Sequence, residues 1–146
     1  RTLLADMRIA SESTKMMLPE IKHGVIPDSG GTARLFQMAG HGLVADLAMT
    51  CRAMDAEEAL RHGVVSRVVP DDQLEETALE VCQQIAANPP FAVKMFRRTL
   101  SRIANPLAQQ TMQEESMGMT AIYETDDYAE MKSARAEERD PEYRGR

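Results

Sequence analysis

Short runs of alternating or clustered apolar residues predict a few β-strands in the first half of the chain. They lie at residues 7–10, 15–18 and 64–69, and Pro70 ends the last of them. Three short strands leave unpaired edges, so we expect further strands upstream that complete the sheet. The missing initiator Met and the uncapped apolar run at residues 1–5 also favour a longer natural chain.

Apolar residues at helical spacing dominate the rest of the chain. The predicted helices cover residues 32–38, 43–50, 56–61 and 72–87, a segment after Pro90, a segment from Pro106 to about Glu124, and one capped by Thr125. Asp72 and Glu75 form a predicted capping box. We expect Pro106 to interrupt one helix and start the next, because proline lacks the backbone N–H that continues a helix.

These patterns divide the chain into an α/β part, residues 1–88, and an all-helical part, residues 89–146. The chain has 11 Met and no Trp, so flexible thioether side chains fill much of the core or of an interface. Apolar positions in the helical part exceed what one short domain can bury, which predicts an oligomer. They include Met112, Met117, Met119 and Ile122.

Charge and composition exclude several classes of partner and cofactor. The 17 Lys and Arg against 23 Asp and Glu give a net charge of -6, the wrong sign for nucleic acid or anionic membranes. No apolar run is long enough to span a bilayer, and the start does not resemble a signal peptide. Cys51 and Cys82 form no disulfide framework, and neither they nor the His residues have metal-ligand spacing. We therefore expect a cytoplasmic protein without a metal.

The densest chemical signal is the loop at residues 18–32, which reads LPEIKHGVIPDSGGT. It carries two carboxylates, Glu20 and Asp28, which a doubled-back loop would aim into one pocket. There, burial and mutual repulsion would separate their pKa values for acid and base work. Structural alternatives remain open: Asp28 or Ser29 as the N-cap of the next helix, and Glu20 in the first turn of a short helix.

This loop resembles the signature segment of the crotonase superfamily, the enoyl-CoA hydratases and isomerases. The similarity covers the whole chain, since other segments match family motifs in the same order. These are LADMRIAS at residues 4–11, MDAEEALRHGVV at residues 54–65 and YRGR at residues 143–146. The chain is thus identified as the C-terminal portion of a crotonase-like protein.

The resemblance implies a spiral of ββα units, here its C-terminal part, followed by a helical trimerisation region that forms trimers or hexamers. It implies acyl-CoA substrates of fatty acid metabolism, with coenzyme A entering as part of the substrate and no separate cofactor. The shared chemistry is a thioester enolate held by two backbone N–H groups while carboxylates move protons. By this likeness Glu20 and Asp28 are the catalytic residues, and Met17, Pro27 and Arg139 contact the substrate.

Departures from the family pattern qualify this interpretation. The first catalytic Glu and both oxyanion donors would precede Arg1, so we expect residues 1–146 alone to be inactive. Hydratases usually have Gly at the position of Asp28, whereas Asp there resembles dienoyl-CoA isomerases. Glu138 replaces a Lys that often meets the CoA phosphate, for which Arg135 or Arg139 would substitute. The alternative function is a non-catalytic crotonase-like scaffold or CoA-binding protein.

Overall fold

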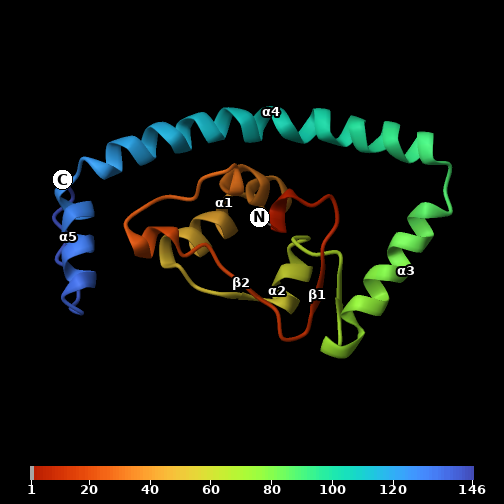
Figure 1. Cartoon of the computed structure of the whole chain (residues 1–146), viewed down its shortest axis with the longest axis horizontal. Coiled ribbons are helices and arrows are strands. Elements are labelled where there is room, and N and C mark those ends of the chain that lie inside the picture. Colours follow the sequence, from red (N-terminus) through yellow and green to blue (C-terminus); the bar gives the residue numbers. More distant parts are fainter. Residues whose placement is uncertain (1) are drawn as a thin grey trace.

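The computed structural model describes residues 2–146, which combine short strands with helices. Figure 1 shows one long helix, α4, running along one side of the molecule, with α3 and α5 at its two ends and the strands below it. The predicted α/β class is confirmed, while the proposed boundary at residue 88 stays a prediction. In chain order the elements are η1 (Thr2–Leu4), β1 (Ile9–Ser11), β2 (Lys15–Met16), η2 (Glu20–His23), α1 (Gly31–Thr50), β3 (Met54–Asp55), α2 (Ala56–Arg61), β4 (Arg67–Val69), η3 (Asp71–Gln73), α3 (Leu74–Ala86), α4 (Pro90–Tyr123) and α5 (Asp126–Ala136).

The strands form two small pairs. β1 pairs with β4 in parallel, with Ile9 opposite Arg67 and Ser11 opposite Val69. β2 pairs with β3 in antiparallel orientation, with Met16 opposite Met54. The three predicted strands are present and shorter than predicted, and β1 ends one residue beyond its predicted bounds, at Ser11. β3 was not predicted, because two residues are too few to show an alternating pattern.

The core lies between these strand pairs, α1 and α2. Its largest fully buried side chains are Leu47, Met54, Val64 and Val65. Each therefore contributes about 1.5–3 kcal/mol of transfer free energy to folding, if it is otherwise exposed in the unfolded chain. The remaining buried members of this cluster are Ala10, Leu35, Val44, Ala56 and Ala59.

The helix α1 replaces the two helices predicted over residues 32–38 and 43–50. The backbone is non-helical at one internal residue, Gly40, with φ 79° and ψ 172°. Only glycine adopts this conformation without steric cost. The two predicted segments are therefore the two arms of one kinked helix.

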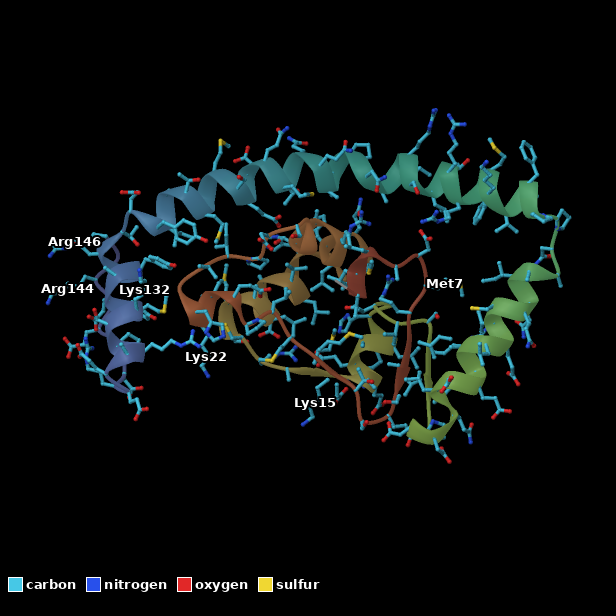
Figure 2. All side chains as sticks on the ribbon, viewed as in Figure 1. Met7, Lys15, Lys22, Lys132, Arg144 and Arg146 are labelled. Atoms are coloured by element: carbon cyan, nitrogen blue, oxygen red, sulfur yellow. The ribbon has the colours of Figure 1, made fainter. Side chains whose placement is uncertain are left out.

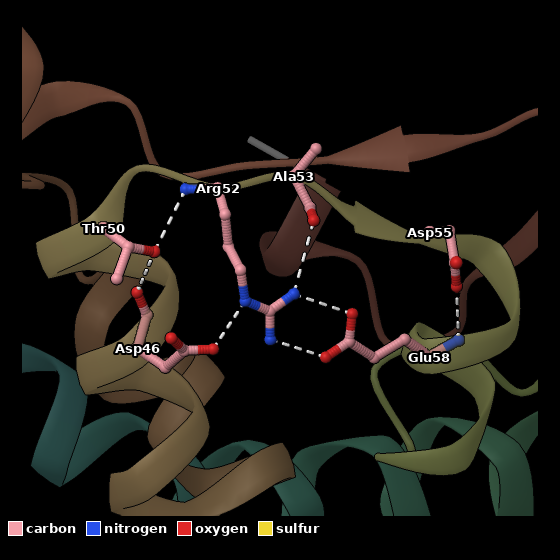
Figure 3. A network of polar contacts seen from close by, with 6 residues as sticks. All are labelled: Asp46, Thr50, Arg52, Ala53, Asp55 and Glu58. Atoms are coloured by element: carbon pink, nitrogen blue, oxygen red, sulfur yellow. Dashed lines mark hydrogen bonds and ion pairs between the residues drawn. The ribbon is translucent and has the colours of Figure 1, made fainter.

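Arg52 ties the end of α1 to α2, as Figure 3 shows. Its Nε donates to Asp46 at 2.5 Å, and its Nη1 and Nη2 donate to the two carboxylate oxygens of Glu58 at 2.8 and 2.6 Å. The hydrogen bond from Arg52 lowers the pKa of Glu58. Asp55 caps α2 by accepting from the Glu58 N–H at 2.8 Å. This junction fixes where β3 enters the core.

The predicted capping box of α3 is wrong. The N-cap of α3 is Gln73, which makes no side-chain cap bond, and Asp72 lies in the preceding η3 turn. The turn forms because Pro70 starts it and its carbonyl accepts from the Gln73 N–H at 3.0 Å. The helix therefore begins two residues later than predicted, which takes Asp72 out of capping position.

The predicted break at Pro106 is also wrong, because α4 continues through it. Two side chains from α1 hold this stretch of α4: Gln37 donates to the Ala104 carbonyl at 3.1 Å, and Arg34 donates to the Asn105 side chain at 3.3 Å. An internal proline costs a helix about 3 kcal/mol, and packing of α4 on α1 offsets this cost.

The N-terminal half of α4 extends beyond the core and exposes its apolar stripe. Phe96 is 66% exposed and Ile103 is 72% exposed. Within residues 2–146, none of the helices combines the length and the apolar character needed to cross a bilayer. The exposed stripe is consistent with the predicted excess of apolar positions in the helical part.

Candidate functional site

Glu20 is positioned by a tight turn directly after β2. Pro19 precedes the η2 turn, and Gly24 ends it in a left-handed conformation with φ 67°. Backbone bonds close the turn, from the Gly24 N–H to the Ile21 carbonyl at 2.9 Å and from the Val25 N–H to the Glu20 carbonyl at 3.2 Å. The alternative that placed Glu20 in the first turn of a short helix is confirmed. This placement directs its side chain at the core.

A cavity of about 150 Å³ adjoins the Glu20 side chain. Its Oε2 is buried, and it has no hydrogen-bond partner among the described residues. Burying a carboxylate oxygen without a donor is costly, so such groups mark candidate sites. The lining residues are Thr2, Leu3, Met16, Met17, Leu18, Glu20, Leu35, Leu47, Met54 and Val64.

The cavity can hold an apolar group against one carboxylate. Met17, predicted to contact the substrate, lines it together with Glu20. A ligand carbon or hydroxyl beside Oε2 would exchange a proton with Glu20. The geometry therefore suits proton transfer at an otherwise apolar ligand.

Asp28 lies elsewhere on the same loop. Its side chain is exposed and accepts a hydrogen bond from the Ser29 hydroxyl at 3.2 Å. The N-cap residue of α1 is Gly30, and no side chain caps the helix, so the alternative of Asp28 or Ser29 as the N-cap is wrong. Of the described residues, neither Asp28 nor the buried Pro27 lines the Glu20 cavity. The expectation that one pocket holds both carboxylates is not met by these residues.

The backbone after Asp28 has two consecutive left-handed residues. Ser29 has φ 60° and Gly30 has φ 73°. Gly30 adopts this conformation freely, whereas Ser29 pays about 1–2 kcal/mol for it. Favourable contacts with the surrounding residues must offset this conformational energy, so the conformation of the loop depends on the elements that pack against it.

Glu115, in the middle of α4, was not singled out from the sequence. It is only 5% exposed, and its Oε2 accepts a hydrogen bond from the Gly30 N–H at 2.9 Å. Its Oε1 is buried without a partner among residues 2–146. A signal exists in the sequence: Glu115 falls on the helical stripe of Ala108, Met112, Met119 and Ile122.

Arg139, predicted to contact the substrate, forms ion pairs near the C-terminus instead. Its Nη1 and Nη2 donate to the two carboxylate oxygens of Glu130 at 2.5 and 3.0 Å. The hydrogen bond from Arg139, with a second from the Glu142 N–H, lowers the pKa of Glu130 to about 2. These contacts attach the C-terminal residues to α5, whose predicted cap Thr125 is confirmed.

The described residues 2–146 contain no group of three or more His, Cys, Asp or Glu side chains arranged to hold a metal ion. Figure 2 shows Lys22 on the side of the core that faces α5, with Arg144 and Arg146 by that helix.

Comparison with known proteins gives one consistent result. The family model described as "Enoyl-CoA hydratase/isomerase" matches residues 2–146. Carnitinyl-CoA dehydratase of Salmonella heidelberg (strain SL476) is 36% identical over 148 residues, which cover 99% of this chain and 57% of that protein. The chain thus spans little more than half the length of the curated relatives it matches.

Solved structures agree with this match. An enoyl-CoA hydratase/isomerase from Pseudoalteromonas atlantica T6c superposes with a TM-score of 0.89 and 29% identity, covering 98% of this chain and 58% of that one. A carnitinyl-CoA hydratase from Mycobacterium avium gives 0.84 and 31%, covering 99% and 57%. The predicted fold, the C-terminal portion of a crotonase-like spiral with a following helical region, is confirmed.

Proposed function

The chain belongs to the enoyl-CoA hydratase/isomerase family, and we propose that it supplies the Glu20 side of an active site acting on acyl-CoA thioesters. The reaction is reversible removal of water from a 3-hydroxyacyl thioester or movement of a double bond, both through a thioester enolate. Carnitinyl-CoA dehydratases among the relatives support the first of these.

One observation carries this proposal: the buried, unpartnered Oε2 of Glu20 beside an apolar cavity. In dehydration, a base removes the α-proton, the electron pair moves into the thioester, and the β-hydroxyl leaves as water after accepting a proton. Glu20 takes or gives one of these protons. Met16 and Met17 supply apolar lining beside it.

The proposal needs groups that residues 2–146 do not provide. Two backbone N–H donors for the thioester oxygen and a second Glu would come from residues before Arg1, in keeping with the 57% coverage of the relatives. Coenzyme A enters as part of the substrate. We also propose a homotrimer or a dimer of trimers, because association would cover the exposed apolar stripe of α4. A cytoplasmic location is part of the same proposal.

Asp28 takes a second role in this proposal. Moving a proton to a carbon further along the acyl chain needs a basic group beyond Glu20, and Asp28 lies on the same loop with an exposed carboxylate. Its only hydrogen-bond donor among residues 2–146 is the Ser29 hydroxyl, which leaves it able to accept a substrate proton. An isomerase would therefore depend on Asp28, and a hydratase would not.

The test substitutes each carboxylate in the intact protein and assays crotonyl-CoA, a 3-hydroxyacyl-CoA and a 3,5-dienoyl-CoA. Glu20→Gln is expected to lower kcat by about 10²–10⁴-fold, with Tm unchanged. Glu12→Gln, an exposed acid on another turn, serves as control. Residues 1–146 alone are expected to give no turnover, since loss of one oxyanion donor costs about 10²–10³-fold. Unchanged rates in both Glu20→Gln and Asp28→Asn would overturn the catalytic assignment of the two carboxylates. Absence of turnover of all three substrates by the intact protein would favour the non-catalytic scaffold.

A further inference from the structure

Glu115 is a buried carboxylate that the proposed reaction does not use. It lies in the middle of α4, 85 residues after the backbone N–H of Gly30 that it binds at 2.9 Å. At 5% exposure it cannot be a solvated side chain of the helix surface. Burying a carboxylate lowers the stability of the fold, so its bond to Gly30 is expected to have a role that offsets this cost.

The group that Glu115 holds is the turn that carries Asp28. Gly30 and Ser29 are both left-handed, with φ 73° and 60°, and Asp28 comes immediately before them. A second bond within the turn, from the Gly31 N–H to the Asp28 carbonyl, is longer at 3.3 Å. The bond from the Gly30 N–H to Glu115 is therefore the shorter of the two, and its acceptor belongs to a distant helix, α4.

Apolar contacts from α4 and α5 press on the same loop. An added Cβ at Gly30 would lie 3.3 Å from Met112, and one at Gly118 would lie 2.9 Å from Ile26. An added Cβ at Gly24 would lie 3.3 Å from Met131. These contacts place the helices tightly against the loop, and Glu115 adds the one directional bond among them. A hydrogen bond constrains the orientation of the turn more strictly than apolar contacts do, and the orientation of the turn sets the direction of the Asp28 side chain.

We infer that Glu115 is a positioning residue, which fixes the direction of the Asp28 carboxylate by holding the Gly30 N–H. The inference rests on the proposed role of Asp28 in moving a remote proton. It assigns to the helical region a part in the chemistry as well as in assembly. It also explains why the apolar stripe of α4 is interrupted by an acid at this position.

The experiment uses the intact protein with a 3,5-dienoyl-CoA in deuterated solvent, and follows exchange of the α-proton and of the remote proton separately. Glu115→Leu keeps the size of the side chain and removes the acceptor. Glu115→Gln keeps an acceptor oxygen for Gly30. Glu114→Leu, an exposed neighbour on α4, is the matched control. The double variant Asp28→Asn/Glu115→Leu tests whether the two residues act through each other.

We expect Glu115→Leu to lower remote-proton exchange and kcat by about 10²-fold, because misplacing a catalytic group by about 1 Å has this effect. Exchange of the α-proton, which does not require Asp28 in the proposed reaction, and KM should stay within about threefold. Glu115→Gln and Glu114→Leu should behave like the wild type. In the Asp28→Asn background, Glu115→Leu should add nothing.

Different outcomes overturn different statements. If Asp28→Asn is slow but Glu115→Leu is not, or if their effects multiply, Glu115 does not act through Asp28. Equal loss of α-proton and remote-proton exchange would mean a general structural effect and would also overturn the inference. If Asp28→Asn keeps remote exchange, or the wild type has none, the role proposed for Asp28 fails and the inference with it. Should Glu115→Leu not fold, Glu115→Asp, which is one methylene too short, takes its place with the same expectations.

Discussion

Two regions of the molecule each bury a carboxylate, and they use it differently. In the η2 turn, Glu20 adjoins an apolar cavity, and its buried oxygen meets no donor among residues 2–146. In the middle of α4, Glu115 also keeps one oxygen without a partner, but its other oxygen holds the Gly30 N–H. Burial of an oxygen alone therefore does not separate a group proposed to react from one that holds the backbone. The two carboxylates differ in whether a protein N–H group binds one of the buried oxygens, as Gly30 does at Glu115.

The largest expected effect is on stability at Glu115. Glu115→Leu leaves the Gly30 N–H without an acceptor, and a buried unsatisfied donor costs about 1–3 kcal/mol. The free energy of unfolding of the intact protein, measured in urea, should fall by this amount. Glu114→Leu, one residue away and exposed, should change it by less than about 0.5 kcal/mol. Equal stability of the two variants would show that the Glu115 bond contributes little.

A second prediction concerns the contact of α4 with the loop. Gly118→Ala would bring a Cβ to 2.9 Å from the Ile26 Cδ1. Overpacking costs about 1–3 kcal/mol, and better helix propensity returns up to about 1 kcal/mol, so a net loss is expected in thermal unfolding. Gly42→Ala, in α1 with nothing within 4 Å, should instead stabilise. Removing Cδ1 in Gly118→Ala/Ile26→Val should restore most of the loss, and failure to do so would place the strain elsewhere.

The opposite sign is expected at Glu20. Glu20→Leu removes an acid whose buried oxygen has no donor, and it leaves no new donor unpaired. The free energy of unfolding should rise by about 0.5–1 kcal/mol while activity is lost. A urea titration of Glu20→Leu beside Glu115→Leu checks the contrast directly. A loss of stability at both sites would erase the distinction between the two carboxylates.

The smallest effect is expected at a partly buried and fully paired carboxylate, Glu130. Its pKa lies at about 2, below the ordinary 4.5, because Arg139 and the Glu142 N–H bond to it. A lowered pKa stabilises the folded form above pH 4.5, and this contribution is lost as the pH falls from 4.5 towards 2. The protection factor of the Glu142 amide, which is the intrinsic exchange rate divided by the observed rate at the same pH, should therefore fall over this range. Glu130→Gln should show a low protection factor at every pH and Glu138→Gln one like that of the wild type, and a pH-independent protection factor in the wild type would refute the assignment.

Local patterns in the sequence predicted the elements that are held by local interactions. The helix α2 appears with the predicted bounds, because Asp55 caps it and Gly63, with φ 69°, follows its last turn. Thr125 caps α5 by accepting from the Tyr128 N–H at 3.1 Å. In both cases the deciding bond joins residues three apart, and neighbouring residues carry that information.

Elements that depend on distant contacts were missed. The continuation of α4 through Pro106 depends on Arg34 and Gln37, about 70 residues earlier. The capping box failed because Asp72 lies in the η3 turn, whose first residue, Asp71, accepts hydrogen bonds from Ser13, 58 residues earlier. Local propensity describes each segment alone, and packing of one segment on another overrides it.

The residues of the candidate site also divide into those predicted from nearby sequence and those placed by distant contacts. Glu20 and Met17 were predicted and line one cavity, because they lie three residues apart where the chain leaves β2 and enters η2. Asp28 was predicted to join them but lies outside the lining, since the αL residues that follow it set its direction. Glu115 escaped notice, because its partner Gly30 is 85 residues away. The catalytic roles of Glu20 and Asp28 stay predictions for the assays above.

The parallel pair β1 and β4 has a consequence for the order of events during synthesis. Ile9 pairs with Arg67, so the ribosome must add 58 more residues after β1 before its partner exists. At about 5–20 residues per second, β1 waits roughly 3–12 s with its backbone groups open to other chains. The antiparallel partner of β2 arrives sooner, because Lys15 pairs with Asp55. Neighbouring nascent chains on one messenger RNA are therefore expected to associate through β1 more readily than through β2.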